Sequence, residues 1–270
     1  MRDVTFGQYY PVDSPVHKCD PRTKILFLIL YIVAVFSAKN FFGLGACAFA
    51  FLIITLCSSV PIGSIFRSVR GVVFLLLFTA ILNLFFYSGG EPLVKWGIIE
   101  ISKEGIYYTV FLAARLILLV MGSSLLTLTT TPVSLTDGIE SLLYPLKLVR
   151  FPVHELALIM SIALRFIPIL SDETARIMNA QRARGADFET GGIIKRVKAV
   201  VPVLIPLLIS AFRRADELGD AMDARCYSGS KVRTKYKKLR FGWRDAFACL
   251  FGVALLTAVL LFRAYFAHVV

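Results

Sequence analysis

The sequence predicts an all-α, polytopic membrane protein with about five transmembrane helices. Of its 270 residues, 57% are hydrophobic, and the mean hydropathy is +0.73. Several apolar runs approach the roughly 20 residues that a helix needs to cross a bilayer. Basic residues gather beside or between these runs, as membrane orientation requires. These three features indicate a chain that lies in the lipid bilayer.

The apolar runs place transmembrane helices at about 24–38, 41–60, 70–87, 106–131 and 245–267. Asp20 and Pro21 begin the first span, because a carboxylate suits an N-cap and proline suits the first helical position. Lys39 and Asn40 interrupt the apolar sequence and predict a turn before the second span. Small residues in the second span permit close packing against another helix; they are Gly43, Ala46, Cys47 and Ala50.

The charges between the spans predict the orientation. Basic residues precede the first span, occur at Arg67 and Arg70 after the second, and are dense between Lys195 and Arg244, whereas the 88–105 loop contains three glutamates. Lysine and arginine are enriched in cytoplasmic loops. We therefore expect the N-terminus, the 61–70 loop and the 132–244 region to be cytoplasmic, and the 88–105 loop and the C-terminus to lie outside.

Three parts follow from this arrangement. Residues 1–131 form an N-terminal membrane domain with four spans, residues 132–244 form a cytoplasmic and membrane-surface domain, and residues 245–270 form a C-terminal span. Pro132 ends the fourth span. The sequence from Ser134 to Asp137 resembles a capping box and predicts a surface helix that runs to about Val149.

A helix over 153–188 is expected to break near Pro168, since proline removes a backbone donor and clashes with the preceding turn. Its second half is amphipathic, and Arg184 shares a face with Ile177 and Ala180. Gly185 then provides a natural helix stop.

A second unit over 193–227 is apolar around Pro202 and Pro206, and Arg225 continues the apolar stripe at its end. The prolines of both units fit either hinges or static kinks.

Two interpretations of these arginines are open. An arginine near a helix C-terminus interacts favourably with the helix dipole and needs no partner. Alternatively, Arg184 and Arg225 are placed to enter a groove of another protein. Two such arginines, about forty residues apart and on the same predicted side of the membrane, favour the second interpretation.

Several stretches, in matching order and spacing over nearly the whole chain, resemble the transmembrane (T) component of energy-coupling factor (ECF) transporters, the EcfT/CbiQ family. They are Asp20–Lys24, Thr129–Pro132, Leu135–Glu140, His154–Met160, Ala163–Pro168, Ala180–Asp187 and Ala221–Arg225. The resemblance is strongest to the subgroup in which several vitamin-binding subunits share one T component, rather than to the dedicated cobalt or nickel type.

The resemblance implies a non-catalytic subunit of an ABC importer in the cell membrane of a prokaryote. Two cytoplasmic ATPases hydrolyse ATP, and long coupling helices transmit the motion to a substrate-binding membrane (S) subunit that takes up a vitamin or other micronutrient. ATP and Mg would be bound by the ATPases, so no cofactor is expected on this chain. The implied ATPase-docking residues are Ala183, Arg184, Gly185, Ala224, Arg225 and Cys226.

Cys226 departs from the family pattern, which has glycine at this position. If the position requires a left-handed backbone, cysteine costs roughly 1 kcal/mol. We therefore expect the second helix either to end differently from the first or to continue into Tyr227 and stop at Gly229.

Two other classes of function can be argued from the residues. Asp216, Asp220 and Asp223 share a helical face beside Glu217, and carboxylates so arranged can hold magnesium for an enzymatic reaction. Interleaved arginines make a solvated, ion-paired face the simpler interpretation. Nucleic acid is not an expected partner, because the basic residues lack interleaved surface aromatics.

A self-contained channel or secondary transporter usually carries ionisable residues within its spans. Asn83 and Arg115 are the main polar candidates here. Arg115 can pair with a backbone carbonyl, extend to the interface or pack against another subunit. The chain has no G-x-x-x-x-G-K-[ST] phosphate loop, so the energy for transport is expected to come from another protein.

Overall fold

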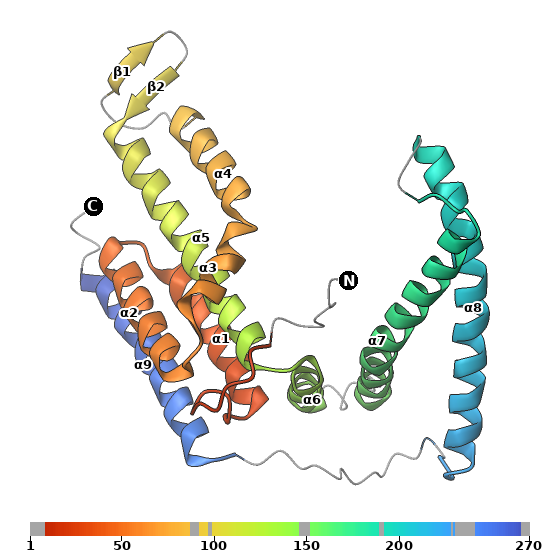
Figure 1. Cartoon of the computed structure of the whole chain (residues 1–270). Helices are drawn as coiled ribbons and strands as arrows, with labels where there is room; N and C mark the ends of the chain where they lie inside the picture. The colour runs from red at the N-terminus through yellow and green to blue at the C-terminus, as the bar shows by residue number, and fades with distance from the viewer. Residues whose placement is uncertain are drawn as a thin grey trace. The chain divides into compact units, whose positions relative to one another are not determined.

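The computed structural model describes residues 9–86, 92–96, 99–145, 152–188, 192–227, 229 and 241–265 (Figure 1). The chain forms two compact units, one of residues 7–153 with 239–270 and one of residues 154–238. The first unit contains α1 (Pro21–Ser37), α2 (Phe41–Ser58), α3 (Ile62–Arg70), α4 (Val73–Phe86), β1 (Pro92–Trp96), β2 (Ile99–Ser102), α5 (Lys103–Thr129), α6 (Pro132–Leu142) and α9 (Trp243–Tyr265). The second contains the long helices α7 (Val153–Ala183) and α8 (Ile193–Asp223).

Helix α1 begins as the sequence predicts. The Asp20 carboxylate accepts a hydrogen bond from the Arg22 backbone N–H at 2.9 Å, and Pro21 is the first helical residue. The helix ends at Ser37, and α2 starts at Phe41, so the predicted turn at Lys39 and Asn40 is confirmed. The cap provides an acceptor for a backbone donor that the helix cannot satisfy.

The core of the first unit surrounds α1, which packs against α9, α5 and α6. Tyr31, Ala34 and Val35 of α1 are almost fully buried there, as is Val259 of α9. The small residues of α2 take part as predicted, because Gly43, Cys47 and Ala50 are buried. A side chain added at Gly43 would lie 3.1 Å from Ala38, closer than usual, and 3.7 Å from Val259 of α9, an ordinary contact distance.

The third span, predicted at 70–87, corresponds to α4, and a bend separates it from α3. Helices α3 and α4 meet at an angle of 57° across a short break at Gly71 and Val72. Residues 62–70, predicted to be a loop, form α3 instead. Ile65 and Val69 lie four residues apart and are buried, and α3 packs on α5. Tertiary burial of this short apolar face stabilises a helix that hydropathy alone assigns to a loop.

A short hairpin, which the sequence analysis missed, lies within the predicted 88–105 loop. Strands β1 and β2 are antiparallel, with Pro92 opposite Ser102 and Trp96 opposite Ile99. Only two residues separate the strands in sequence, and valine, tryptophan and isoleucine favour extended backbone. The chain remains overwhelmingly helical within the described residues, in agreement with the predicted class.

The length and composition of the helices fit a multi-pass membrane protein. Among the described residues, four helices (α2, α5, α7 and α9) are long and apolar enough to span a bilayer, and the bent pair α3 and α4 is a candidate for a fifth span. Helix α1 has 17 residues and is short for a span. Helix α7 was assigned to the cytoplasmic part, and its location relative to the bilayer stays a prediction.

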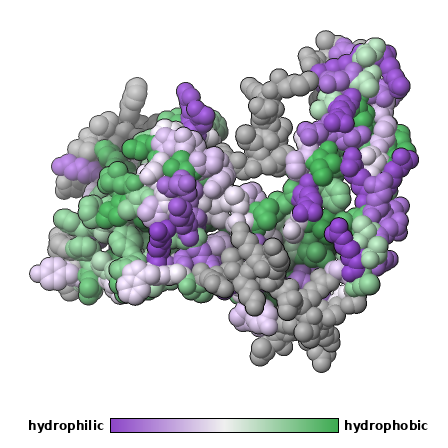
Figure 2. Space-filling model, turned by 60° about the horizontal axis from the view of Figure 1, so that its bottom comes forward, coloured by the Kyte–Doolittle hydropathy of each residue, from purple (hydrophilic) through white to green (hydrophobic). Residues whose placement is uncertain are grey.

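Surface hydropathy agrees with a membrane location. Figure 2 shows large hydrophobic areas on the visible face of the first unit, and hydrophilic residues along much of the visible edge of the helix pair. On the first unit, exposed side chains include Phe49, Phe74 and Leu77, whose exposed fractions are 66%, 81% and 60%. A contiguous apolar surface of this kind is stable in contact with lipid rather than with water.

Candidate functional site at two helix ends

Helix α7 ends in a glycine turn directly after Arg184. Gly185 has a φ of +88°, in the left-handed region. Its N–H donates to the Arg182 carbonyl at 2.9 Å, and the N–H of Ala186 donates to the Gln181 carbonyl at 3.0 Å. This pair of bonds is the Schellman motif, which uses a left-handed residue to satisfy the last carbonyls of a helix. The predicted stop at Gly185 is confirmed.

Helix α8 ends in the same way. Cys226 has a φ of +57°, and its N–H donates to the Asp223 carbonyl at 2.9 Å. The N–H of Tyr227 donates to the Met222 carbonyl at 3.0 Å. Both expectations for this end were therefore wrong: the helix neither ends differently nor continues to Gly229. The two backbone hydrogen bonds and the Cys226 conformation reproduce the turn at Gly185, although cysteine lacks glycine's freedom.

The two ends present their arginines alike. Arg184 and Arg225 both immediately precede the left-handed residue, and both side chains are exposed. Within the described residues, no ion pair or side-chain hydrogen bond is found for either arginine. Ala183 and Ala224, the residues before them, are also exposed and carry no bulky side chain. Each guanidinium therefore lies at a helix end of defined backbone conformation, and its N–H donors are available to another molecule.

Helices α7 and α8 run in opposite directions within their unit and are inclined to each other (Figure 1). Glu173 of α7 and Arg214 of α8 form an ion pair at 3.7 Å. Arg184 lies eleven residues beyond Glu173, and Arg225 lies eleven residues beyond Arg214. At 1.5 Å per residue, each arginine therefore lies roughly 16 Å beyond the ion pair along its own helix, and the two are displaced in opposite directions. They therefore lie on opposite sides of the ion pair.

A shallow apolar groove separates part of α7 from α8. Its volume is about 350 Å³, and Arg214 is its charged lining residue. The lining residues from both helices include Ile162, Phe166, Leu218 and Met222. Contact between the two helices is sparse, so apolar side chains of both helices face open space.

The three prolines do not break their helices. Pro168 lies inside α7, and Pro202 and Pro206 lie inside α8. The expectation that the first helix breaks near Pro168 was therefore wrong. All three prolines occupy exposed positions, where the missing backbone hydrogen bond does not leave a carbonyl enclosed in the protein core.

The acidic residues of α8 do not form a metal site in the described part of the chain. Asp216, Asp220 and Asp223 are exposed on the helix, as is Glu217. No group of three or more histidine, cysteine or acidic side chains converges there as metal ligands would.

The polar residues predicted within the spans each donate a hydrogen bond to a backbone carbonyl, although Nε of Arg115 has no partner among the residues that the structure describes. Arg115 of α5 donates from Nη2 to the Ala38 carbonyl at the end of α1, and its guanidinium lies 4.7 Å from the centre of the Phe111 ring. The Asn83 amide donates to the Thr79 carbonyl at 2.9 Å. Pairing of Arg115 with a backbone carbonyl, one of three expectations, is confirmed.

A buried anchor that the sequence analysis missed joins α1 to α9. The Asp245 carboxylate accepts the Asp20 N–H through Oδ1 and the Gly242 N–H through Oδ2, both at 2.8 Å. Asp245 is only 3% exposed. The signal was present in the sequence, because an acidic residue three positions after Gly242 fits the capping-box spacing at the start of α9. Its bond to Asp20 required the tertiary structure.

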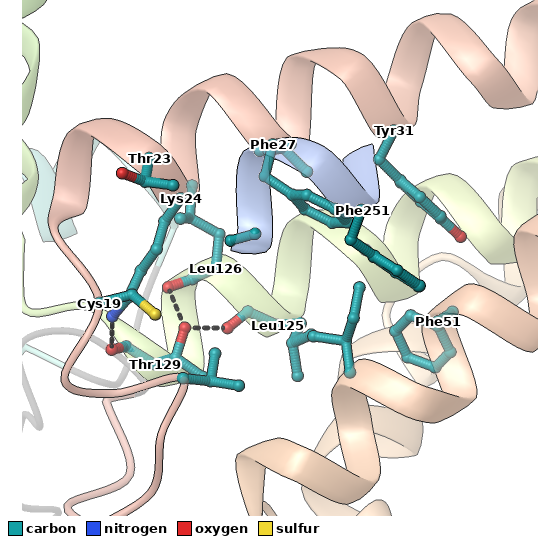
Figure 3. A pocket seen from close by; sticks show the side chains of 15 residues that line it. Cys19, Thr23, Lys24, Phe27, Tyr31, Phe51, Leu125, Leu126, Thr129 and Phe251 are labelled. Atoms are coloured by element: carbon teal, nitrogen blue, oxygen red, sulfur yellow. Dashed lines mark hydrogen bonds between the residues drawn. The ribbon is translucent and has the colours of Figure 1, made fainter. Parts of the chain in front are cut away.

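Lys24 makes a second link at the same end of α1. Its ammonium donates to the Thr129 and His17 carbonyls at 2.9 and 3.2 Å and to the Thr130 hydroxyl at 3.3 Å. Beside it lies an apolar cavity of about 120 Å³ among α1, α2, α5 and α9 (Figure 3). Phe27 and Phe251 stack along the cavity at 6.2 Å. The three donors of Lys24 are already used, so the cavity offers no free charge to a ligand.

Comparison with known proteins places the chain in a family. The family described as cobalt transport protein, CbiQ, matches residues 13–236. The energy-coupling factor transporter transmembrane protein EcfT of Clostridium kluyveri is 48% identical over 266 residues, which cover 98% of both chains. The EcfT of Ruminiclostridium cellulolyticum is 46% identical, over 98% of this chain and 99% of its own. The chain belongs to the EcfT/CbiQ family.

Family membership agrees with the architecture. An EcfT of Brevibacillus brevis, 43% identical over 259 residues, also aligns with 96% of this chain and 98% of its own length. The relatives carry the name of a transmembrane transporter component, and this chain has several apolar helices suited to a bilayer. It is the transmembrane component of an ECF transporter and a multi-pass membrane protein.

Proposed function

We propose that this chain couples ATP hydrolysis in two cytoplasmic ABC-type ATPases to a substrate-binding membrane subunit that imports a vitamin or other micronutrient. Arg184 and Arg225 dock one ATPase each. The chain itself is non-catalytic, and the ATPases bind ATP and Mg. The observation that carries the proposal is the pair of matching helix ends, each with an exposed arginine held next to a left-handed residue.

Arginine suits this docking role chemically. Its planar guanidinium has five donors in a fixed fork and can bond to carboxylates and backbone carbonyls at the same time. The Schellman turn fixes the backbone on both sides of the arginine, so less conformational entropy is lost on binding. Small alanine neighbours at 183 and 224 allow close approach of the partner surface.

The spacing of the two ends supports two ATPases rather than one. Displacements of roughly 16 Å in opposite directions place the two ends up to about 33 Å apart, which is comparable to the diameter of a small domain. The Glu173–Arg214 ion pair links the two helices midway between the docking ends. Movement of either ATPase would therefore act on both helices, and Pro168, Pro202 and Pro206 are the proposed hinges along them.

The substrate-binding subunit is proposed to pack on apolar surface. The groove between α7 and α8, whose lining is apolar apart from Arg214, and the exposed apolar side chains of the spans provide such surface. Under the predicted orientation, the N-terminus and the coupling helices are cytoplasmic and the C-terminus lies outside.

The test is retention of the ATPases on the purified chain. The tagged chain is co-expressed with a pair of ABC ATPases from the same genome and purified in detergent. We expect the native chain to retain both ATPases, Arg184→Ala and Arg225→Ala to lose different ones, and the double variant to lose both. Truncation of one partner of a buried, hydrogen-bonded charge pair costs about 2–5 kcal/mol, so each lost contact should weaken binding at least 30-fold.

A matched control is Arg176→Ala with Arg213→Ala, which removes two exposed arginines that precede the ends of the same helices. This variant should retain both ATPases. Arg184→Lys should reduce ATP-driven uptake, because lysine cannot reproduce the planar fork. Failure of the native chain to hold any ATPase, or full uptake by Arg184→Lys, would contradict the proposed docking.

A further inference from the structure

The bend between α3 and α4 forms an amphipathic elbow in the first unit. On one side, Ile65 and Val69 are 0% and 8% exposed, and α3 packs on α5. On the other side, Phe66 is 58% exposed and Val73, just beyond the bend, is 46% exposed. Helix α3 therefore carries apolar side chains on its open side as well as on its packed side.

Two arginines lie on the open side of this elbow. Arg67 and Arg70 are exposed and three residues apart, so they are neighbours on the helix surface. With Phe66 and Val73 they line a shallow groove of about 470 Å³. The groove thus combines two cationic side chains with an apolar wall.

These charges have no acidic partner within the described residues, where no ion pair is found for Arg67 or Arg70. The sequence itself contains no aspartate or glutamate between Asp20 and Glu91. The segment is therefore a local region of uncompensated positive charge. Such a region attracts an anion with planar or tetrahedral oxygen acceptors.

We propose that the elbow binds the phosphate of an anionic phospholipid through Arg67 and Arg70. The acyl chains lie along Phe66 and Val73 and continue over the exposed apolar face of α4, where Phe74 and Leu77 are 81% and 60% exposed. An amphipathic basic helix that joins an apolar helix at an angle of 57° suits the boundary between headgroups and hydrocarbon. This lipid site is independent of the ATPase docking at α7 and α8.

The test uses a fluorescent reporter beside the arginines. Phe66→Trp is introduced into the full chain, and the protein is reconstituted in phosphatidylcholine vesicles that contain either brominated phosphatidylglycerol or brominated phosphatidylcholine. The same chain without this substitution provides the background of the native tryptophans. Bromine quenches indole at short range, so quenching reports lipid at the elbow. We expect phosphatidylglycerol to be preferred by about 25-fold, on the order of fivefold for each arginine.

Charge variants test whether Arg67 and Arg70 cause the preference for phosphatidylglycerol. Arg67→Gln with Arg70→Gln should abolish the preference, Arg67→Lys with Arg70→Lys should keep most of it, and Arg176→Gln with Arg213→Gln should leave it unchanged. Equal quenching by both lipids, or a preference that survives removal of Arg67 and Arg70, would overturn the proposal.

Inorganic phosphate is added as a competitor in a separate experiment. Loss of the preference at millimolar phosphate would mean that the groove binds free phosphate and not lipid. Helix content by circular dichroism confirms that each variant is folded.

Discussion

At the residue scale, Cys226 shows how strongly a helix end can constrain its backbone. A non-glycine residue with positive φ is uncommon, and in the described part of the chain only Ser59 and Cys226 have it. Cys226 accepts this conformation because the turn satisfies the Asp223 and Met222 carbonyls. Two backbone hydrogen bonds, each contributing about 1 kcal/mol, offset a conformational cost of similar size.

We expect Cys226→Gly to stabilise the end of α8 by about 0.5–1 kcal/mol. Glycine removes the left-handed strain, and its greater freedom in the unfolded chain reduces the gain. Hydrogen exchange of the Tyr227 amide, which bonds to the Met222 carbonyl, should slow by roughly two- to fivefold. The matched change Gly185→Ala should speed exchange of the Ala186 amide in α7. Unchanged or faster exchange in Cys226→Gly would show that the cysteine is not strained.

The stability of the N-terminal segment is predicted to depend on pH through His17. Its Nε2 lies 3.0 Å from the Tyr10 carbonyl, which can only accept, so Nε2 carries the proton. Nδ1 then accepts from the Ser14 hydroxyl at 2.7 Å. Burial lowers the pKa of His17 below its ordinary value of 6.5, and the charge of Lys24 adds to this effect, although the bond to Tyr10 opposes it.

The lowered pKa of His17 determines the direction in which stability changes with pH. Folding favours the neutral ring, so the contribution to stability is fully present above pH 6.5, the ordinary pKa, and is lost as the pH falls through the lower pKa of the folded state. We expect the thermal unfolding midpoint of the detergent-solubilised chain to fall over this range, and His17→Gln to flatten the profile there. An identical profile in the variant would assign the pH dependence to other groups.

At the element scale, close contacts between helices depend on single glycines. Gly122 of α5 faces Tyr31 of α1, and a side chain added there would approach the Tyr31 ring to 2.5 Å. Tyr31 is 2% exposed and its hydroxyl donates to the Leu118 carbonyl at 3.4 Å, so the ring has little room to move. The crossing of α1 and α5 therefore depends on the absence of a side chain at position 122.

Gly122→Ala should destabilise the first unit by about 1–3 kcal/mol through overpacking. The measurement is the thermal unfolding midpoint in detergent. Gly45→Ala in α2 is the matched control, because nothing lies within 4 Å of its added side chain. That substitution should be neutral or stabilising by up to about 1 kcal/mol, since alanine has the higher helix propensity. Equal effects of the two substitutions would contradict the close contact with Tyr31.

At the element scale, helices α7 and α8 differ from what the sequence pattern predicts. Proline is a strong signal for a helix break, yet α7 and α8 continue through three prolines. Each helix has 31 residues, and one missing hydrogen bond is a small part of its backbone pairing. Conversely, α3 was predicted to be a loop because its nine residues are too few for a hydropathy signal.

At the scale of the whole molecule, the charge pattern predicts one orientation in the membrane. The N-terminal segment before α1 should be cytoplasmic, and the start of α5 should face outward. Lys24, near the start of α1, bonds to Thr129 at the end of α5. Arg115, which lies earlier in α5, bonds to Ala38 at the end of α1. The two helices are therefore antiparallel.

Labelling of single cysteines tests this orientation. In a background with Cys19, Cys47, Cys57, Cys226 and Cys249 replaced by serine or alanine, Asp13→Cys and Lys103→Cys each provide one exposed site. We expect a membrane-impermeant maleimide added to intact cells to label position 103 and not position 13. Permeabilised cells provide the control, in which both positions should react. The reverse pattern would invert the predicted topology.

The sequence by itself determined the all-α membrane class, most span positions, the cap of α1, the stop of α7 and the family resemblance. These features depend on local composition, spacing and capping chemistry, which neighbouring residues specify. Only the tertiary structure decided the Asp20–Asp245 bond, the burial of α3, the turn at Cys226 and the ion pair that places Arg184 and Arg225 on its opposite sides. Some of these features join residues that are far apart in the chain, and in others backbone hydrogen bonds offset local strain. The free energy of both kinds depends on contacts that exist only after folding.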